Sequence, residues 1–133
     1  MQRRLFIQTL AAAGATAAFP LRAQTAKPQL EVWKDASCGC CKDWIAHMRS
    51  SGFAVNAYDS GNIAARARLG LPQKLGSCHT AWVNGYVVEG HVPASDVKRL
   101  LKERPKALGL AVPGMPVGSP GMDGPEYGGR KDR

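Results

Sequence analysis

Three of the four cysteines in this 133-residue chain lie within four positions, in the motif Cys38-Gly39-Cys40-Cys41, and the fourth belongs to the pair Cys78-His79. A thiolate is both a nucleophile and a metal ligand, and thiolates with imidazoles bind zinc or copper. Two of the three ways of pairing four cysteines would join strained near neighbours here, which disfavours purely structural disulfides. The residue types therefore indicate a reactive or metal-binding site.

These side chains can be used in three ways. One zinc ion can be held by Cys38, Cys41, Cys78 and His79, which leaves Cys40 without a role. A redox dithiol, as in a thiol–disulfide oxidoreductase, can use Cys38 and Cys41 as its Cys-x-x-Cys pair. Several Cu(I) ions can be bridged by all four thiolates, because soft sulfur ligands suit Cu(I). Only copper uses every cysteine and is favoured; zinc, a redox dithiol and structural disulfides stay open.

Other residues are weaker candidates for the same site. Met115 and Met122 lie in an irregular segment from which a thioether can add to a thiolate site. His91 ends a predicted strand that reaches the same edge of the sheet, so it is a candidate ligand or a neighbour of one. His47 follows Cys40 by seven residues on a predicted helix, about 10 Å along the axis, and is interpreted as a surface or capping histidine.

The elements that must position these residues follow from the hydropathy pattern. Alternating apolar residues predict strands, and apolar residues spaced by three and four predict helices. Asn84-Gly85 between two apolar runs predicts a hairpin. The predicted strands are 30–34, 53–58, 80–83 and 86–91, and the predicted helices run from 41 to a cap at Gly52, from 62 to 69 and from 96 to 104.

The order β-α-β-α-β-β-α predicts an α/β fold of thioredoxin-like arrangement, with a four-stranded mixed sheet. In that arrangement the third strand runs antiparallel beside the first, about 4.8 Å away, and begins next to the end of the first. Cys78 and His79 precede the third strand, and the motif Cys38-Gly39-Cys40-Cys41 follows the first. We therefore expect Cys78 to face the three clustered cysteines.

Both ends of the chain are expected to lie outside the domain. Residues 1–23 have the features of an export signal of the twin-arginine type: Arg3-Arg4 precedes an apolar run too short to span a membrane. Residues 24–110 would form the metal-binding domain, and residues 111–133 an irregular tail rich in Pro and Gly that contains methionines. This organisation predicts a periplasmic protein with no membrane span after processing.

Composition and charge restrict the class of function. A chain of 133 residues with 44% hydrophobic residues fits one small globular domain. The formal net charge of +8 falls to +5 without the three arginines of residues 1–23. The basic residues between Lys98 and Lys106 are expected on the solvent face of the last helix, without interleaved aromatic residues. An exported protein with this pattern is not expected to bind nucleic acid.

Four motifs in order carry a family resemblance: Cys38-Gly39-Cys40-Cys41, Ser77-Cys78-His79-Thr80, the run Gly85–Pro93, and the Pro/Gly/Met segment Leu110–Met122. Together they resemble the CopG-type copper-resistance family of small exported bacterial proteins, over about Leu30 to Met122. The resemblance implies a thioredoxin-like fold, a periplasmic setting, and copper bound through the cysteine triplet and Cys78. Interconversion of Cu(I) and Cu(II) has been proposed for that family.

We therefore predict a periplasmic copper-binding protein for copper resistance or homeostasis, holding more than one Cu(I). The expected bridging thiolates are those of Cys38, Cys40, Cys41 and Cys78, and the expected terminal ligand is the imidazole of His79. The outer candidates are His91, Met115 and Met122. Oxidation would compete with metal by forming a Cys38–Cys41 disulfide. The expected partners are copper ions and other periplasmic copper-handling proteins.

Overall fold

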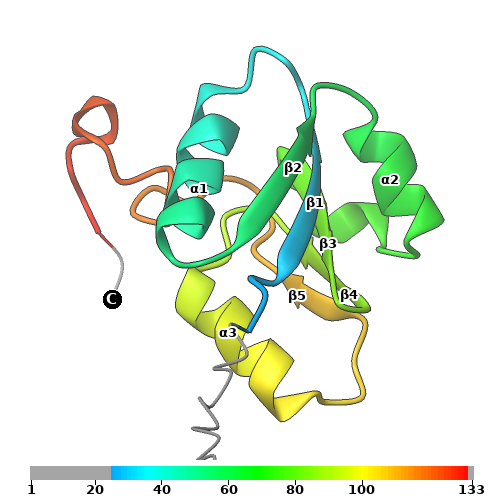
Figure 1. Ribbon diagram of the computed structural model, residues 1–133. Helices are drawn as coiled ribbons and strands as arrows, with labels where there is room; N and C mark the ends of the chain where they lie inside the picture. The colour runs from blue at the N-terminus through cyan, green and yellow to red at the C-terminus, as the bar shows by residue number, and fades with distance from the viewer. Residues whose placement is uncertain (1–24, 132–133) are drawn as a thin grey trace, which may run out of the picture.

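Residues 25–131 are described by a computed structural model, in which a mixed sheet lies between helices on both of its faces (Figure 1). The strands are β1 (Gln29–Lys34), β2 (Ala54–Tyr58), β3 (His79–Val83), β4 (Tyr86–Glu89) and β5 (Gly109–Ala111). The helices are α1 (Gly39–Ser50), α2 (Asn62–Arg68) and α3 (Ala94–Glu103), with short 3-10 turns at Gln73–Leu75 and Pro125–Tyr127. The predicted export signal, residues 1–23, lies outside the described residues.

The sheet has the order β2-β1-β3-β4-β5 and five strands, so the prediction of four strands was wrong. β1 is parallel to β2 and antiparallel to β3, β4 is antiparallel to β3, and β5 is parallel to β4. The missed strand, β5, has only three half-buried residues, which are too few to give an alternating pattern. Two backbone hydrogen bonds flank β5, from Val87 N to Leu108 O (2.9 Å) and from Val112 N to Glu89 O (3.0 Å).

α1 packs on the sheet through the apolar stripe that its sequence predicts. Cys41, Trp44, Ile45 and Met48 are its buried residues. They join a core that includes Leu30 and residues from the other strands. Figure 1 shows α1 and α3 on one face of the sheet and α2 on the other. The N-terminus of α1, which carries the cysteines, is therefore fixed at one end of the sheet. Among residues 25–131, no helix combines the length and hydropathy needed to cross a bilayer.

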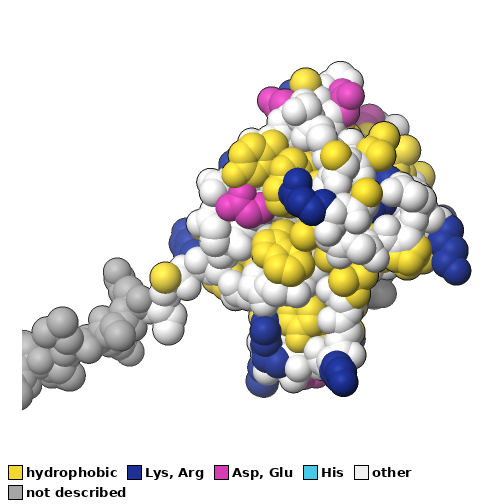
Figure 2. Space-filling model, turned by 90° about the vertical axis from the view of Figure 1, so that its right-hand side faces the viewer, with side chains coloured by type: hydrophobic (Ala, Val, Ile, Leu, Met, Phe, Trp, Pro, Cys, Tyr) yellow, Lys and Arg dark blue, Asp and Glu magenta, His cyan; other side chains and the backbone are white. Residues whose placement is uncertain are grey.

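Several basic residues lie on the outside of this core. The basic residues of α3, such as Lys98 and Lys102, are exposed, as predicted for its solvent face. On the side of the molecule where α2 lies, basic side chains are scattered among hydrophobic ones (Figure 2). Ile63 is 66% exposed, and the guanidinium of Arg68 lies 5.1 Å from the centre of the Trp33 ring.

Candidate metal centre

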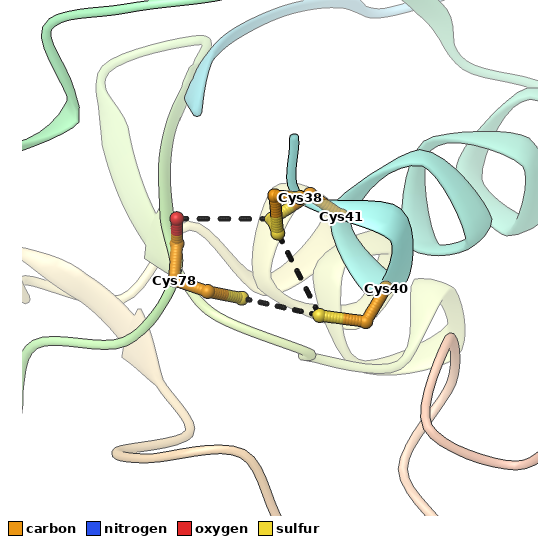
Figure 3. Close-up of side chains that lie close together, drawn as sticks. All are labelled: Cys38, Cys40, Cys41 and Cys78. Atoms are coloured by element: carbon orange, nitrogen blue, oxygen red, sulfur yellow. Dashed lines mark hydrogen bonds between the residues drawn. A yellow bond between two sulfur atoms is a disulfide. The ribbon is translucent and has the colours of Figure 1, made fainter. Parts of the chain in front are cut away.

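The sheet brings the two cysteine motifs together. Lys34, the last residue of β1, pairs with His79, the first residue of β3. The loop that follows β1 therefore lies beside the loop that precedes β3. Cys38 is the N-cap residue of α1, and Cys78 directly precedes β3. Figure 3 shows the sulfur of Cys78 directed toward that of Cys40. The expectation that Cys78 faces the cysteine triplet is confirmed, because the Cys40 and Cys78 sulfurs lie 3.9 Å apart.

Two of the four cysteines form a disulfide in this structure, and two are free thiols. Cys38 and Cys41 are bonded, with an S–S distance of 2.01 Å, which is the pairing expected to compete with metal. The free Cys40 sulfur lies 3.6 Å from that of Cys38 (Figure 3). The sulfur atoms of the four cysteines all lie within 4.8 Å of one another. Reduction of the disulfide would therefore leave four thiols around one small volume.

Two buried imidazoles border the same sulfur. His79 Nδ1 lies 3.3 Å and His91 Nε2 lies 3.1 Å from Cys78 Sγ. Both histidines are completely buried. His91 reaches this place because β4 is antiparallel to β3, so that Glu89 at the end of β4 pairs with Thr80 near the start of β3. The structure thus brings His91, an outer candidate, as close to Cys78 as the favoured His79.

Burial controls the protonation of these groups in the metal-free chain. Burial, assisted by the nearby Cys40 thiol and opposed by a hydrogen bond from Ser77, raises the pKa of the Cys78 thiol to about 12. Burial also lowers the pKa of His79 to about 3, assisted by His91 and opposed by the Gly90 backbone. The pKa of His91 is lowered by burial, against the Pro120 carbonyl. Both imidazoles are therefore neutral, as metal ligands must be.

The irregular segment 113–122, which we call the strap, covers this site. Its Pro120 carbonyl oxygen lies 2.7 Å from His91 Nδ1. A carbonyl only accepts, so Nδ1–H donates and the Nε2 lone pair faces Cys78. Near its other end, Ser77 Oγ donates to the Gly114 carbonyl, which anchors the strap beside Cys78. Sequence patterns missed these contacts, because the strap has no periodicity.

The two tail methionines, which belong to the strap, differ in exposure. Met115, next to the anchored Gly114, is 53% exposed, whereas Met122, near Pro120, is 8% exposed. Their role as donors stays a prediction. His47, interpreted from sequence as a surface or capping residue, accepts a hydrogen bond of 3.1 Å from Ala94 N–H through Nε2. His47 therefore caps α3, the helix that follows β4.

A buried ion pair holds the loop before Cys78, and sequence analysis missed it. Arg66 of α2 contacts Glu89 of β4 through Nε at 2.9 Å and Nη2 at 2.8 Å. Ser77 N–H donates to Glu89 Oε1 (2.8 Å), and Arg66 Nη2 donates to the Ser77 carbonyl (2.8 Å). Both groups of the Ser77 peptide backbone are thus fixed by charged side chains. A charged residue in the buried run Tyr86–Glu89 was the available signal.

Fold and site together define a class: a small mixed α/β domain with a cysteine-rich candidate metal centre at one end of its sheet. A family described as "Protein of unknown function, DUF411" matches residues 75–122, which include Cys78, both buried histidines and the strap. Among curated proteins, none matches the chain.

Two solved structures, titled as forms 2 and 1 of the copper resistance protein CopG, are each 50% identical to the chain with a TM-score of 0.71. The alignments cover 80% of this chain and 83% and 82% of the other chains, respectively. The chain therefore belongs to the CopG-type copper-resistance family.

Proposed function

We propose that this protein binds copper as Cu(I) for copper resistance or homeostasis. The observation that carries the proposal is the gathering of four cysteine sulfurs within 4.8 Å of one another. The donor set fits the ion, because several thiolates in one small volume suit a soft monovalent cation and can bridge neighbouring ions. The family relation to copper resistance proteins supports copper over other soft metals.

The reduced site would hold more than one Cu(I). Cys40 and Cys41 are adjacent and cannot easily chelate one tetrahedral ion together, which favours bridging between ions. We assign bridging roles to Cys38, Cys40, Cys41 and Cys78 and a terminal role to His79. His91, Met115 and Met122 are additional candidates, of which His91 is supported by its 3.1 Å distance to Cys78 Sγ.

The cellular setting of this function would be the bacterial periplasm. The twin-arginine-like export signal of residues 1–23 supports this location. There the protein would exchange copper with other periplasmic copper-handling proteins. We also assign the domain a thioredoxin-like fold, a proposal supported by the order β2-β1-β3-β4 within the sheet and by a cysteine motif at the start of α1.

Cu(I) titration of the protein, reduced under anaerobic conditions, tests the proposal together with elemental analysis. We expect more than one Cu(I) per chain and a lower stoichiometry in Cys78→Ser and Cys40→Ser. Ser37→Ala, which changes an exposed residue beside the motif, is the matched control and should leave the stoichiometry unchanged. One tightly bound zinc ion without preference for Cu(I) would replace this proposal by the structural zinc site.

A thiol–disulfide oxidoreductase is the second candidate, and the Cys38–Cys41 disulfide favours it. The two functions are distinguished by turnover without metal. An oxidoreductase would reduce insulin disulfides with metal-free protein and lose this activity in Cys38→Ser alone. A copper-binding protein would show no such turnover. Interconversion of Cu(I) and Cu(II) would join the two functions, since oxidation of the Cys38–Cys41 dithiol to the disulfide would release two protons and two electrons, which reduce two Cu(II) to two Cu(I).

A further inference from the structure

Part of the sheet face on the side of α2 is exposed to solvent. Two residues of β1 that alternate with its core residues, Glu31 and Trp33, lie on this side, and their cross-strand partners in β2 are Asn56 and Tyr58. Tyr58 is 44% exposed, Asn56 is exposed as well, and Glu31 and Trp33 are half-buried. Arg68, the last residue of α2, reaches over the Trp33 ring. We call these five residues the aromatic face.

Contacts within the aromatic face already hold its rings in place. Trp33 stacks on Tyr58, with ring centres 5.5 Å apart and an angle of 18° between the planes. The Arg68 guanidinium carbon lies 5.1 Å from the centre of the Trp33 ring. Tyr58 O–H donates to a carboxylate oxygen of Glu31 (2.6 Å), and Trp82 of β3, the cross-strand partner of Glu31, adds a half-buried ring beside them. Because these side chains are ordered before a partner arrives, binding would cost little side-chain entropy.

The charged groups that this surface leaves available to a partner are positive. Glu31 already accepts hydrogen bonds from two side chains of β2, and Asp59, directly after β2, is paired with Lys34. Within the part of the chain that the structure describes, the exposed Arg68 guanidinium has no hydrogen bond or ion pair, so its N–H donors are available. The exposed Arg49 reaches the edge of β2, where its Nη2 donates to a backbone carbonyl (3.1 Å). Figure 2 shows hydrophobic side chains beside basic ones on this side of the molecule. Charge complementarity therefore favours an acidic partner, whereas a second copy of the chain would bring like charges together.

The aromatic face lies near the end of the sheet that carries the cysteines. The loop before α2 packs against its rings, since a Cβ on Gly61 would lie 3.9 Å from Trp33 Cδ1. The next residue, Asn62, donates through Nδ2 to the Cys78 carbonyl (3.4 Å). A protein bound to the aromatic face would therefore contact the loop that connects this face to Cys78.

We infer that the aromatic face is a docking surface for an acidic protein segment that also presents apolar side chains. Carboxylates of such a segment would accept hydrogen bonds from the Arg68 guanidinium, and its apolar side chains would pack on the rings. Trp, Tyr and Arg are the residue types that contribute most to binding energy in protein interfaces. A protein can also form hydrogen bonds with Glu31 and Asn56 between the rings, whereas lipid tails cannot. The inference goes beyond the proposed copper binding and does not depend on a metal ion.

NMR titration of the metal-free full chain with an acidic copolymer of glutamate and tyrosine tests the inference. We expect the indole N–H signals of Trp33 and Trp82 to shift, together with the amide signals of β2. The signal of Trp44, the third tryptophan, is the internal reference, because Trp44 is completely buried and its Nε1–H donates to the Val92 carbonyl (2.9 Å). Binding should weaken at higher salt, which screens the charges, and with polyglutamate, which lacks rings. These readouts use the unaltered protein and so do not depend on whether a variant folds.

Two variants remove the groups that would bind the copolymer. Arg68→Gln and Tyr58→Ala should each lower the affinity for the copolymer by about tenfold. Lys102→Gln is the matched control, because it removes an exposed cation from α3, on the other side of the sheet (Figure 1), and it should leave the affinity unchanged. The amide spectrum of each variant shows whether it has folded.

Four results would overturn the inference. The first is a copolymer that shifts neither Trp33 nor the amides of β2. The second is equal shifts on α3 and on the aromatic face, or equal losses in Arg68→Gln and Lys102→Gln, which would show general attraction to a basic chain. The third is a shift of the same signals with protein concentration alone, which would assign the face to a second copy. The fourth is binding to phosphatidylglycerol vesicles without a response to the copolymer, which would assign the face to a membrane.

Discussion

Replacing Arg66 by methionine removes one partner of a buried ion pair while keeping an unbranched apolar side chain. The Glu89 carboxylate, completely buried, would lose both of its contacts with the guanidinium. The Ser77 carbonyl would lose its donor as well. Breaking a buried pair by removing one partner costs about 3–5 kcal/mol, because an uncompensated charge stays in the interior. We expect Arg66→Met to lower the free energy of unfolding by that amount.

Urea denaturation followed by tryptophan fluorescence measures this loss, with the cysteine redox state held constant. Arg99→Met is the matched control. Its ion pair with Asp96 is exposed and 3.9 Å long, so its loss should change the free energy of unfolding by less than about 1 kcal/mol. Glu89→Gln keeps an oxygen that can accept the Ser77 N–H, and the double variant Arg66→Met/Glu89→Gln removes both charges of this buried pair. The double variant should be more stable than the sum of the single effects predicts, by about 0.5–3 kcal/mol.

The same pair positions Cys78, so the prediction has a second readout. Amide hydrogen exchange at Ser77 should accelerate in Arg66→Met, because both backbone groups of that residue depend on the pair. The reasoning is refuted if Arg66→Met costs no more than Arg99→Met. Strict additivity in the double variant would also refute it, since it would mean that the two charges do not interact.

Two further predictions concern groups around the site. Burial and Lys98 lower the pKa of His47, whereas Asp123 raises it, so the folded chain favours the neutral ring that accepts Ala94 N–H. The contribution of this ring to the free energy of unfolding should therefore be fully present above about pH 6.5 and decrease below it. Urea denaturation of the metal-free protein at several pH values should show that the free energy of unfolding decreases less at low pH in His47→Gln than in the unaltered protein. An equal decrease in both would contradict the capping role of His47. Gly121→Ala should lower the free energy of unfolding by about 1–3 kcal/mol. Gly128→Ala, at a similar positive φ of 79° but with open space around it, should cost clearly less, and equal costs would show that the packing of the strap is unimportant.

Sequence patterns predicted the parts of this fold that depend on periodicity. The apolar stripe of α1 and the hairpin at Asn84-Gly85 are local signals, and both are present. The meeting of Cys78 with the triplet was also predictable, because antiparallel pairing of β1 with β3 fixes which loops share an edge. These predictions need only the period of a strand or helix and the handedness and order of the connections.

The parts that were missed depend on contacts between segments without periodicity. β5 is a three-residue strand at the edge of the sheet, and the strap reaches His91 through a single carbonyl of Pro120. The pairing of Arg66 with Glu89 joins α2 to β4, and a single sequence does not reveal which buried charges are partners. Such contacts decide how the candidate donors are oriented, although the candidates themselves could be chosen from their residue types.

The crowding of sulfur and nitrogen atoms at this end of the sheet makes the proposed binding of a cation electrostatically favourable. In the metal-free chain the Cys78 thiol, with its pKa raised to about 12 by burial, keeps its proton at neutral pH. Its deprotonation there would place a negative charge beside Cys40 and two neutral imidazoles, none of which compensates it. A metal ion bound at the proposed site would supply the missing positive charge, and its binding would release the Cys78 proton. A Cys78 thiolate is therefore costly without a metal ion and would be stabilised by one, as the proposed copper binding requires.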